Sequence, residues 1–220
     1  ATLKEDEKQL GCISLDLGAG STSIAVYENN KLIYLDAIPI GGQHITNDIA
    51  RGLSTTIESS ERLKTLHGSV ISNPSDDYDF IDVPILGSDQ NQSKEINRSE
   101  LNSIIKPRVE ETLELARQKL IEYNINRKPI RNLVLTGGGA LLEGVEDYAQ
   151  TIFDSKTRIG KPKVINGMLS SISKPQFSQT FGLIFYNEDD YNIDFLAEKK
   201  QKIKKNKIFS RFFAWLDQYI

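Results

Sequence analysis

Two glycine-rich turns of this chain carry the residue types that bind phosphate and nucleoside groups. The first turn is Asp16-Leu17-Gly18-Ala19-Gly20-Ser21-Thr22, and the second is Leu135-Thr136-Gly137-Gly138-Gly139-Ala140. Each turn follows a short apolar run that is typical of a buried strand. Glycine lets the backbone approach a ligand closely and adopts positive φ at little cost. The two turns together therefore indicate a nucleotide site more strongly than either turn alone.

The first turn offers three kinds of group to a nucleotide. Asp16 provides a carboxylate that could hold a hydrated Mg²⁺, and the hydroxyls of Ser21 and Thr22 are hydrogen-bond donors. The backbone N–H groups from Gly18 to Thr22 form a concave donor surface for phosphate oxygens. The alternative is an ordinary hairpin loop closed by an Asx-type turn.

The second turn and a charged pair supply the nucleoside side of this site. Gly137, Gly138 and Gly139 precede a predicted helix, whose N-terminus would add free N–H groups and a favourable dipole. Glu61 and Lys64 lie three residues apart on another predicted helix and could reach a ribose together. The alternatives are a plain strand-to-helix turn and a solvated ion pair.

The elements that must position these groups alternate between strand-like and helix-like patterns. Residues 2–9 are charged and predict a frayed start. The strand-like segments lie at residues 10–17, 22–27, 32–40, 80–86 and 130–135. The first three of these segments follow one another closely, which predicts an antiparallel meander.

Helical spacing of apolar residues marks five further segments. The predicted helices lie at residues 45–53, 57–66, 99–123, 141–153 and 178–186. Ser54 or Thr55 is expected to cap the second helix, and Pro107 is expected to break or kink the third. Residues 88–93 and the basic segment 157–162 are expected to be loops.

Composition places the chain among ordinary soluble proteins. Of its 220 residues 39% are hydrophobic and 26% are charged, and no apolar stretch is long enough to span a bilayer. A single cysteine, Cys12, excludes an intramolecular disulfide and fits a cytosolic address. The two histidines, His44 and His67, have no cysteine-rich spacing near them, which excludes a zinc-finger type of site. Because the chain begins at Ala1, we expect that an upstream segment was removed.

The C-terminal segment differs in charge from the rest of the chain. Residues 196–220 hold seven basic and two acidic side chains, a net +5, so the remainder carries −8 of the total −3. As a helix, residues 208–220 would place Phe209, Phe212, Phe213, Leu216 and Ile220 on one face, with Trp215 suited to an interface. Such a helix is about 20 Å long, too short to cross a hydrocarbon core of about 30 Å. It could lie on a membrane, or dock on this protein's own body or on a partner.

Several stretches resemble the ATPase fold shared by actin, heat-shock chaperones and hexokinase, and within it the FtsA family of bacterial cell-division proteins. The resemblance covers about Gly11 to Leu183, with the charged linker and terminal helix similar to the family's membrane-targeting sequence. Besides the two glycine turns, the family-like stretches are Ile38-Pro39-Ile40-Gly41-Gly42, residues 44–50, Glu61-Arg62-Leu63-Lys64 with Gly68, Ile104-Ile105-Lys106-Pro107-Arg108 and Arg158-Ile159-Gly160.

The resemblance implies an α/β fold: an actin-like (ribonuclease H-like) ATPase domain with an inserted α+β subdomain, followed by a C-terminal amphipathic helix. The implied boundaries are residues 1–42 and 129–186 for the discontinuous subdomain IIA, and 43–128 for the inserted subdomain IIB. A charged linker over residues 187–207 and a membrane-targeting helix over 208–220 complete the chain.

The resemblance also assigns roles to individual residues. ATP with Mg²⁺ is the implied cofactor, with Asp16 holding the metal through water. The nucleotide-binding residues are Asp16, Gly18, Ala19, Gly20, Ser21 and Thr22 for phosphate, Glu61 and Lys64 for ribose, and Gly137, Gly138 and Gly139 for adenosine.

The implied partners are the acidic C-terminal tail of the tubulin-like protein FtsZ, further copies of the chain in a filament, other division proteins and anionic lipids, but no nucleic acid. Arg98 and Arg108 in the inserted subdomain are candidates for binding the tail. The membrane side chains are Phe209, Phe212, Phe213, Trp215, Leu216 and Ile220. The implied location is the cytoplasmic face of the inner membrane at the division site.

Two departures from the family pattern bear on activity. Ala19 and Ser23 stand where the family's loop usually has glycine and aspartate, and nothing before Asp16 matches the family's first phosphate loop. Phosphoryl transfer needs groups from both sides of the nucleotide, so we expect at most a weak ATPase and negligible turnover by this chain alone. The resulting interpretation is an ATP-binding scaffold that links FtsZ filaments to the membrane. The alternatives are a sugar- or acetate-kinase-like phosphotransferase and a pilus-assembly relative.

Overall fold

A five-stranded mixed sheet organises the computed structural model, which describes residues 1–87, 92–125, 132–163 and 172–185. The chain divides into two compact units, Ala1–Leu183 and Ile184–Ile220, and the description below concerns the first. The strand order is β3-β2-β1-β6-β7, and a separate two-stranded ribbon pairs β4 with β5. The strands are β1 (Cys12–Leu17), β2 (Thr22–Glu28), β3 (Lys31–Ile38), β4 (Phe80–Pro84), β5 (Ser93–Asn97), β6 (Asn132–Thr136) and β7 (Lys156–Ile159).

The predicted meander is confirmed, because β1, β2 and β3 pair antiparallel in sequence order. Asn29 and Asn30 form the turn between β2 and β3 with φ of 52° and 62°, values that asparagine tolerates better than most residues. β6 pairs parallel with β1 and sets Asp16 opposite Thr136. The two glycine-rich turns therefore leave the sheet side by side, at the carboxyl ends of adjacent parallel strands.

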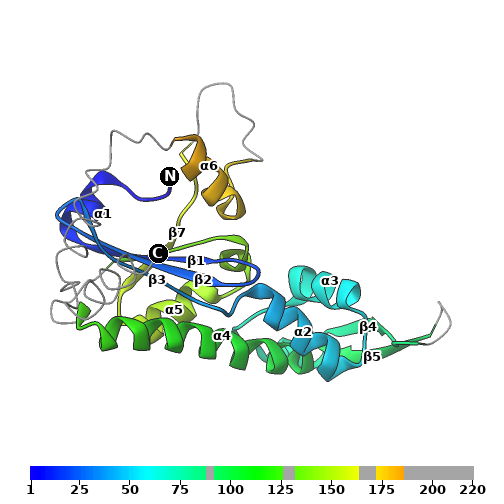
Figure 1. The fold of residues 1–220 in the computed structure, drawn as a ribbon. Coiled ribbons are helices and arrows are strands. Elements are labelled where there is room, and N and C mark those ends of the chain that lie inside the picture. The colour runs from blue at the N-terminus through cyan, green and yellow to red at the C-terminus, as the bar shows by residue number, and fades with distance from the viewer. Residues whose placement is uncertain (88–91, 126–131, 164–171, 186–220) are drawn as a thin grey trace, which may run out of the picture. The chain divides into compact units, whose positions relative to one another are not determined.

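Between β3 and β6 the chain makes an insertion that contains the three longest described helices, α2, α3 and α4 (Figure 1). The α-helices of the first unit and its boundary are α1 (Glu5–Leu10), α2 (Gly42–Leu53), α3 (Ile57–His67), α4 (Arg98–Glu122), α5 (Val145–Phe153) and α6 (Ser178–Ile184). Short 3₁₀ turns lie at Pro74–Asp77, Gly138–Leu141 and Pro175–Phe177. None of the described helices is long and apolar enough to cross a membrane.

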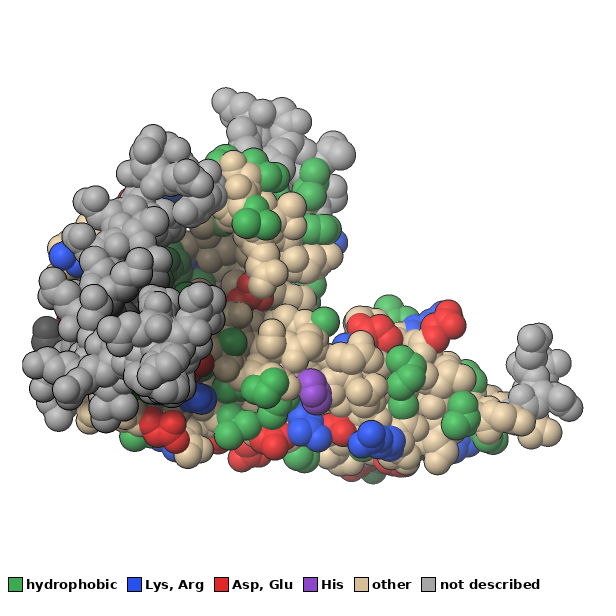
Figure 2. Space-filling model, in the orientation of Figure 1, with side chains coloured by type: hydrophobic (Ala, Val, Ile, Leu, Met, Phe, Trp, Pro, Cys, Tyr) green, Lys and Arg blue, Asp and Glu red, His purple; other side chains and the backbone are tan. Residues whose placement is uncertain are grey.

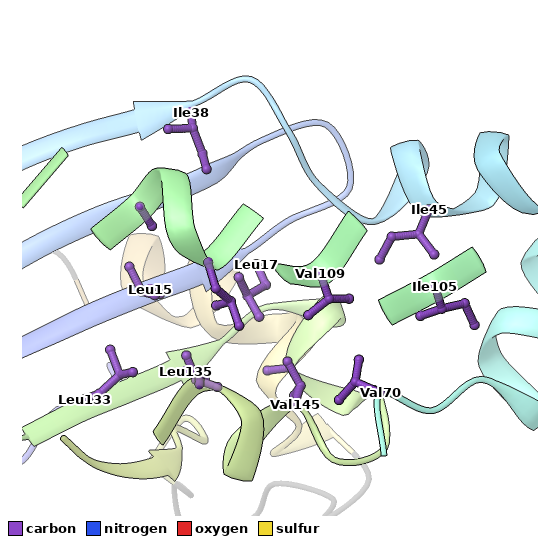
Figure 3. Close-up of a cluster of buried hydrophobic side chains, with 14 of the residues drawn as sticks. Leu15, Leu17, Ile38, Ile45, Val70, Ile105, Val109, Leu133, Leu135 and Val145 are labelled. Carbon is purple, nitrogen blue, oxygen red and sulfur yellow. The ribbon is translucent and has the colours of Figure 1, made fainter. Parts of the chain in front are cut away.

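One hydrophobic core joins the sheet to the insertion. Figure 3 shows Leu15, Leu17, Leu133 and Leu135 on the strands facing the helices, with Val109 of α4 lying between them and Ile45 and Ile105 of the insertion. The predicted subdomain boundaries stay predictions. α4 lies wholly within the predicted insertion, and its buried residues share one core with the strands outside the insertion.

The expected break at Pro107 is wrong, because α4 runs without interruption from Arg98 to Glu122 (Figure 1), while the alternative of a kink stays a prediction. Proline inside a helix removes one backbone hydrogen bond and costs about 3 kcal/mol. The helix survives because Leu101 and Ile105 before the proline, and Val109 and Leu113 after it, are buried in the same core. Tertiary packing on both sides of Pro107 thus outweighs the local penalty.

Two local expectations in the N-terminal half are also wrong. The charged start is not frayed, because residues 5–10 form α1, which Arg158 holds through two hydrogen bonds of 2.6 Å to Glu7. The cap of α3 is neither Ser54 nor Thr55 but Thr56, whose Oγ1 accepts from the Ser59 N–H at 3.1 Å. Ser54 instead ends α2 with φ of 51°.

The C-terminal half brings two further corrections. The helix expected over residues 141–153 begins only at Val145, because Gly144 adopts φ of 78° and separates it from the 3₁₀ turn Gly138–Leu141. The basic segment expected as a loop contains the edge strand β7. β5, which begins at the last residue of the loop expected at 88–93, was not predicted. Only Ile96 among its residues is buried, so the sequence shows no alternation of apolar and polar residues there. The predicted linker and amphipathic helix at residues 187–220 lie outside the described residues.

Candidate functional site

A cleft of about 910 Å³ brings together three of the groups that the sequence singled out. Its lining includes Gly18 and Ala19 of the first turn and Gly138 and Gly139 of the second. From α3 it includes Glu61 and Lys64. Residues up to 121 positions apart in the sequence, Gly18 and Gly139, therefore face one space, which the register of β1 and β6 makes possible.

The first glycine turn is held by a second pair of glycines. Gly42 N–H donates to the Gly18 carbonyl at 2.9 Å, and Gln43 N–H donates to the Ala19 carbonyl at 2.8 Å. A Cβ on Gly41 would lie 2.5 Å from the Gly18 oxygen, so only glycine fits there. Ala19 is not among the described residues with positive φ, so its backbone accommodates a side chain without strain. Sequence analysis placed Gly41 and Gly42 in a family-like stretch but did not predict this contact.

The two hydroxyls predicted to bind phosphate differ in availability. Thr22 is fully buried and donates its hydroxyl proton to the Ile40 carbonyl at 2.9 Å, which ties β2 to the segment before α2. Ser21 is exposed, and within the described residues its hydroxyl makes no hydrogen bond. Ser21 therefore keeps an unused hydroxyl donor but does not line the cleft, whereas Thr22 lines the cleft with a hydroxyl proton that is already donated. The phosphate role of both hydroxyls stays a prediction.

Asp16 lies against the second turn. Gly137 adopts φ of 83°, and a Cβ there would lie 2.3 Å from Asp16 Oδ1. Burial raises the pKa of Asp16 above its ordinary value, although hydrogen bonding from Gln179 partly offsets this. A partly buried carboxylate of this kind fits a nearby cation, whose charge would favour the ionised form. Among the described residues no group of three or more metal-ligating side chains gathers. The binding of Mg²⁺ by Asp16 through water stays a prediction.

The second turn is fixed by the start of α6. Gly137 N–H donates to the Pro175 carbonyl at 3.2 Å, while the buried Thr136 hydroxyl donates to the Gly160 carbonyl at 3.0 Å. The Thr136 and Ser178 hydroxyl oxygens lie 2.5 Å apart. The predicted helix N-terminus is absent from this turn, since a 3₁₀ turn follows it. Nothing in the local sequence signals these long-range contacts.

Glu61 and Lys64 form an ion pair of 2.6 Å at the cleft wall. Thr46 of α2, fully buried, bonds to both: its hydroxyl lies 2.5 Å from Glu61 Oε2 and 2.8 Å from Lys64 Nζ. Burial alone would raise the pKa of Glu61, but hydrogen bonds from Lys64 and Thr46 outweigh burial and hold that pKa below its ordinary range. Thr46 was not predicted as part of the site, although its place one residue after Ile45 puts it beside the buried face of α2.

The two arginines predicted to bind an acidic tail are already paired within the chain. Arg98 donates to the His67 carbonyl at 2.9 Å and pairs with Asp76 and Glu143. Arg108 donates to Asp48 at 2.6 Å. Figure 2 shows acidic and basic side chains interleaved along the edge where α2 and α4 lie. Their role in binding a partner stays a prediction.

A family model matches the part of the chain that contains both glycine-rich turns and the Glu61–Lys64 pair. The family model described as "Cell division protein FtsA" matches residues 13–182, most of the chain. The chain belongs to the FtsA family. An FtsA from Rhizobium meliloti (strain 1021) is 41% identical over 187 residues, covering 84% of this chain and 42% of that protein. The FtsA of Escherichia coli (strain K12) is 30% identical, covering 98% of this chain and 53% of that protein. The chain thus spans about half the length of these FtsA relatives.

Solved structures show that this FtsA-family chain has an actin-like fold. MreB5 of Spiroplasma citri bound to ADP superposes with a TM-score of 0.61 at 17% identity, covering 83% of this chain and 55% of that one. The same protein bound to AMPPNP gives a TM-score of 0.62. The predicted α/β actin-like fold is confirmed, and the FtsA match favours this family over the kinase and pilus-assembly alternatives.

Proposed function

We propose that this chain binds MgATP in the cleft and acts as the nucleotide-dependent part of a cell-division scaffold. The observation that carries the proposal is the convergence of the Gly18 turn, the Glu61–Lys64 pair and the Gly138–Gly139 turn on one space. These groups match phosphate, ribose and adenosine respectively. The MreB5 structures with ADP and AMPPNP, which share the fold, support the choice of an adenine nucleotide.

The proposal is one of binding rather than efficient hydrolysis. Phosphoryl transfer depends on positioning the nucleotide and the attacking water from several sides. Asp16 pairs in the sheet with Ser23, where the family pattern has a second carboxylate. At the phosphate end of the nucleotide the chain thus offers one carboxylate, Asp16, and the backbone N–H groups of the first turn. These groups suit binding of the nucleotide better than its hydrolysis.

A change of charge at Ala19 tests where the phosphates lie. Ala19 lines the cleft, is exposed and has an ordinary φ, so larger side chains fit its backbone. Ala19→Asp is expected to weaken MgATP binding at least tenfold, since unit charges 4 Å apart repel by about 4 kcal/mol at an effective dielectric constant near 20. Titration with a fluorescent ATP analogue measures this.

The control for that experiment is Ala19→Asn, which has nearly the same shape without the charge. We expect it to change the affinity less than about threefold, because no charge is introduced. Equal weakening by the two variants, with both proteins folded, would show that steric change rather than phosphate repulsion is responsible and would refute the proposed placement.

We further propose that the scaffold binds the FtsZ tail and anionic membranes at the cytoplasmic face of the division site, and assembles with copies of itself. The support is the family membership together with the aromatic helix predicted behind six lysines between residues 199 and 207. Lysines near an anionic surface contribute about 1 kcal/mol each, and buried apolar side chains add to this.

Truncation of residues 208–220 tests the membrane part. The intact protein is expected to float with vesicles that contain anionic lipid and to carry FtsZ with it, whereas the truncated protein stays at the bottom of the gradient. FtsZ lacking its C-terminal tail should not float with either. Equal flotation of intact and truncated protein would contradict the membrane role, and flotation of tail-less FtsZ would contradict the tail as ligand.

A further inference from the structure

Lys64 has no proton left over for a ligand. An ammonium group carries three N–H donors, and Lys64 Nζ donates to the Gly42 carbonyl at 3.1 Å, to Thr46 Oγ1 at 2.8 Å and to Glu61 Oε2 at 2.6 Å. The side chain is also only 14% exposed. A direct bond from Lys64 to a sugar would therefore break a contact that the chain already makes.

Glu61 and Lys64 both line the cleft, and Glu61 is the more exposed of the two. The Glu61 side chain is 50% exposed, and both groups that donate to it, from Thr46 and Lys64, bond to the same oxygen, Oε2. Among the described residues Oε1 has no hydrogen-bond partner. Glu61 also lines the cleft, whereas Thr46 is fully buried behind it and does not.

The hydroxyl of Thr46 completes this arrangement. It has one proton, and the contact of 2.5 Å to a carboxylate is shorter than the 3.1 Å contact to the Gly42 carbonyl. Charge-assisted hydrogen bonds are the shorter and stronger ones, so the proton goes to Glu61 while the oxygen accepts from Lys64. Two donors therefore fix Glu61 Oε2 and with it the direction of Oε1.

We propose that Thr46 and Lys64 are positioning residues that hold Glu61 Oε1 as the acceptor for one ribose hydroxyl, so that the cleft prefers ribonucleotides to the corresponding deoxynucleotide. This inference rests on the proposed nucleotide function. It gives the two charged residues different roles: Glu61 contacts the sugar, whereas Lys64, like Thr46, acts only by orienting Glu61. Hydroxyl and carboxylate are matched as donor and acceptor.

The test measures the affinity of the intact protein for ATP, 2′-deoxy-ATP and 3′-deoxy-ATP. Hydrogen bonds to charged groups contribute about 1.5–3 kcal/mol, so the unmodified protein should bind ATP about tenfold or more tightly than one of the two analogues. Thr46→Val, which keeps the shape but removes the hydroxyl, should reduce this ratio to about threefold or less while leaving the affinity for that analogue unchanged. Thr46→Ser should restore the ratio.

A second variant tests the same point without altering α2. Lys64→Met should also reduce the preference for the ribose, but should have no further effect on affinity in a Glu61→Ala background, because Lys64 acts only through Glu61. A further loss in that background, or equal weakening of all three nucleotides by Thr46→Val, would overturn the inference. Binding of ATP without any preference would overturn this inference alone, whereas absence of nucleotide binding would also refute the proposed function.

Discussion

Replacement of Gly41 by alanine is expected to weaken MgATP binding by about a hundredfold, although Gly41 belongs to neither glycine-rich turn. The added Cβ would lie 2.5 Å from the Gly18 oxygen and 2.6 Å from the Ala19 oxygen. Both are backbone atoms, so relief requires the phosphate turn itself to move. Displacement of a binding group by about 1 Å is enough for a loss of this size.

The cause of this loss would be steric rather than conformational. Gly41 has φ of −159°, which any residue adopts, so alanine adds no backbone strain there. Gly20→Ala, in the first turn itself, is the matched control: it keeps the backbone N–H predicted to face phosphate, a Cβ there would have no neighbour within 4 Å, and Gly20 does not line the cleft. Fluorescence titration of both variants, with thermal melting to confirm folding, makes the comparison. Nucleotide binding by Gly41→Ala as tight as by Gly20→Ala would contradict the role given to Gly41.

Replacement of Arg98 by alanine is expected to lower the free energy of unfolding by about 3 kcal/mol. The Arg98 guanidinium joins α3, α4 and the segment before α5 through the His67 carbonyl and the carboxylates of Asp76 and Glu143. The Asp76 side chain is only 3% exposed. Removing one partner of a buried ion pair leaves an uncompensated charge, which costs about 3–5 kcal/mol. Asn102 and the Asn73 N–H still bond to Asp76, which places the expected loss at the lower end.

Arg117→Ala is the control for this change, because Arg117 and its partner Glu114 are both more than 40% exposed. Exposed ion pairs contribute about 0–1 kcal/mol, so its unfolding free energy should change little. Urea denaturation of both variants gives the two values. A loss at Arg98 no larger than that at Arg117 would show that the Arg98 cluster does not hold these segments together. A loss of partner binding in Arg98→Ala should be interpreted only after this measurement.

Local sequence patterns predicted much of the fold and the outline of the site. The apolar runs and glycines located β1, β2, β6 and both turns, and the register of β1 and β6 explains why the turns meet. The predictions that failed concern elements whose structure depends on contacts between residues far apart in the sequence. α4 continues through Pro107 because its core partners hold both sides, and β7 forms because β6 lies beside it.

The residues missed at the site have the same explanation. Gly41 acts on Gly18, and Thr46 acts on Glu61 fifteen residues later; no local pattern reports such contacts. A buried threonine in an amphipathic helix looks like any other half-apolar core residue until its neighbours are known. Conversely, Thr22 had the right type and position for phosphate, but its proton is already donated to the Ile40 carbonyl.

The unbroken course of α4 limits how this molecule can move. Its 25 residues span about 37 Å as one rod, which contacts α2 and the β4–β5 ribbon near its start and β3 and α5 further along. When a continuous helix tilts about its middle, its two ends move in opposite directions. Its middle, at Val109, borders the cleft. A ligand that tilts α4 there would therefore displace both of its ends, and with them the elements that α4 contacts.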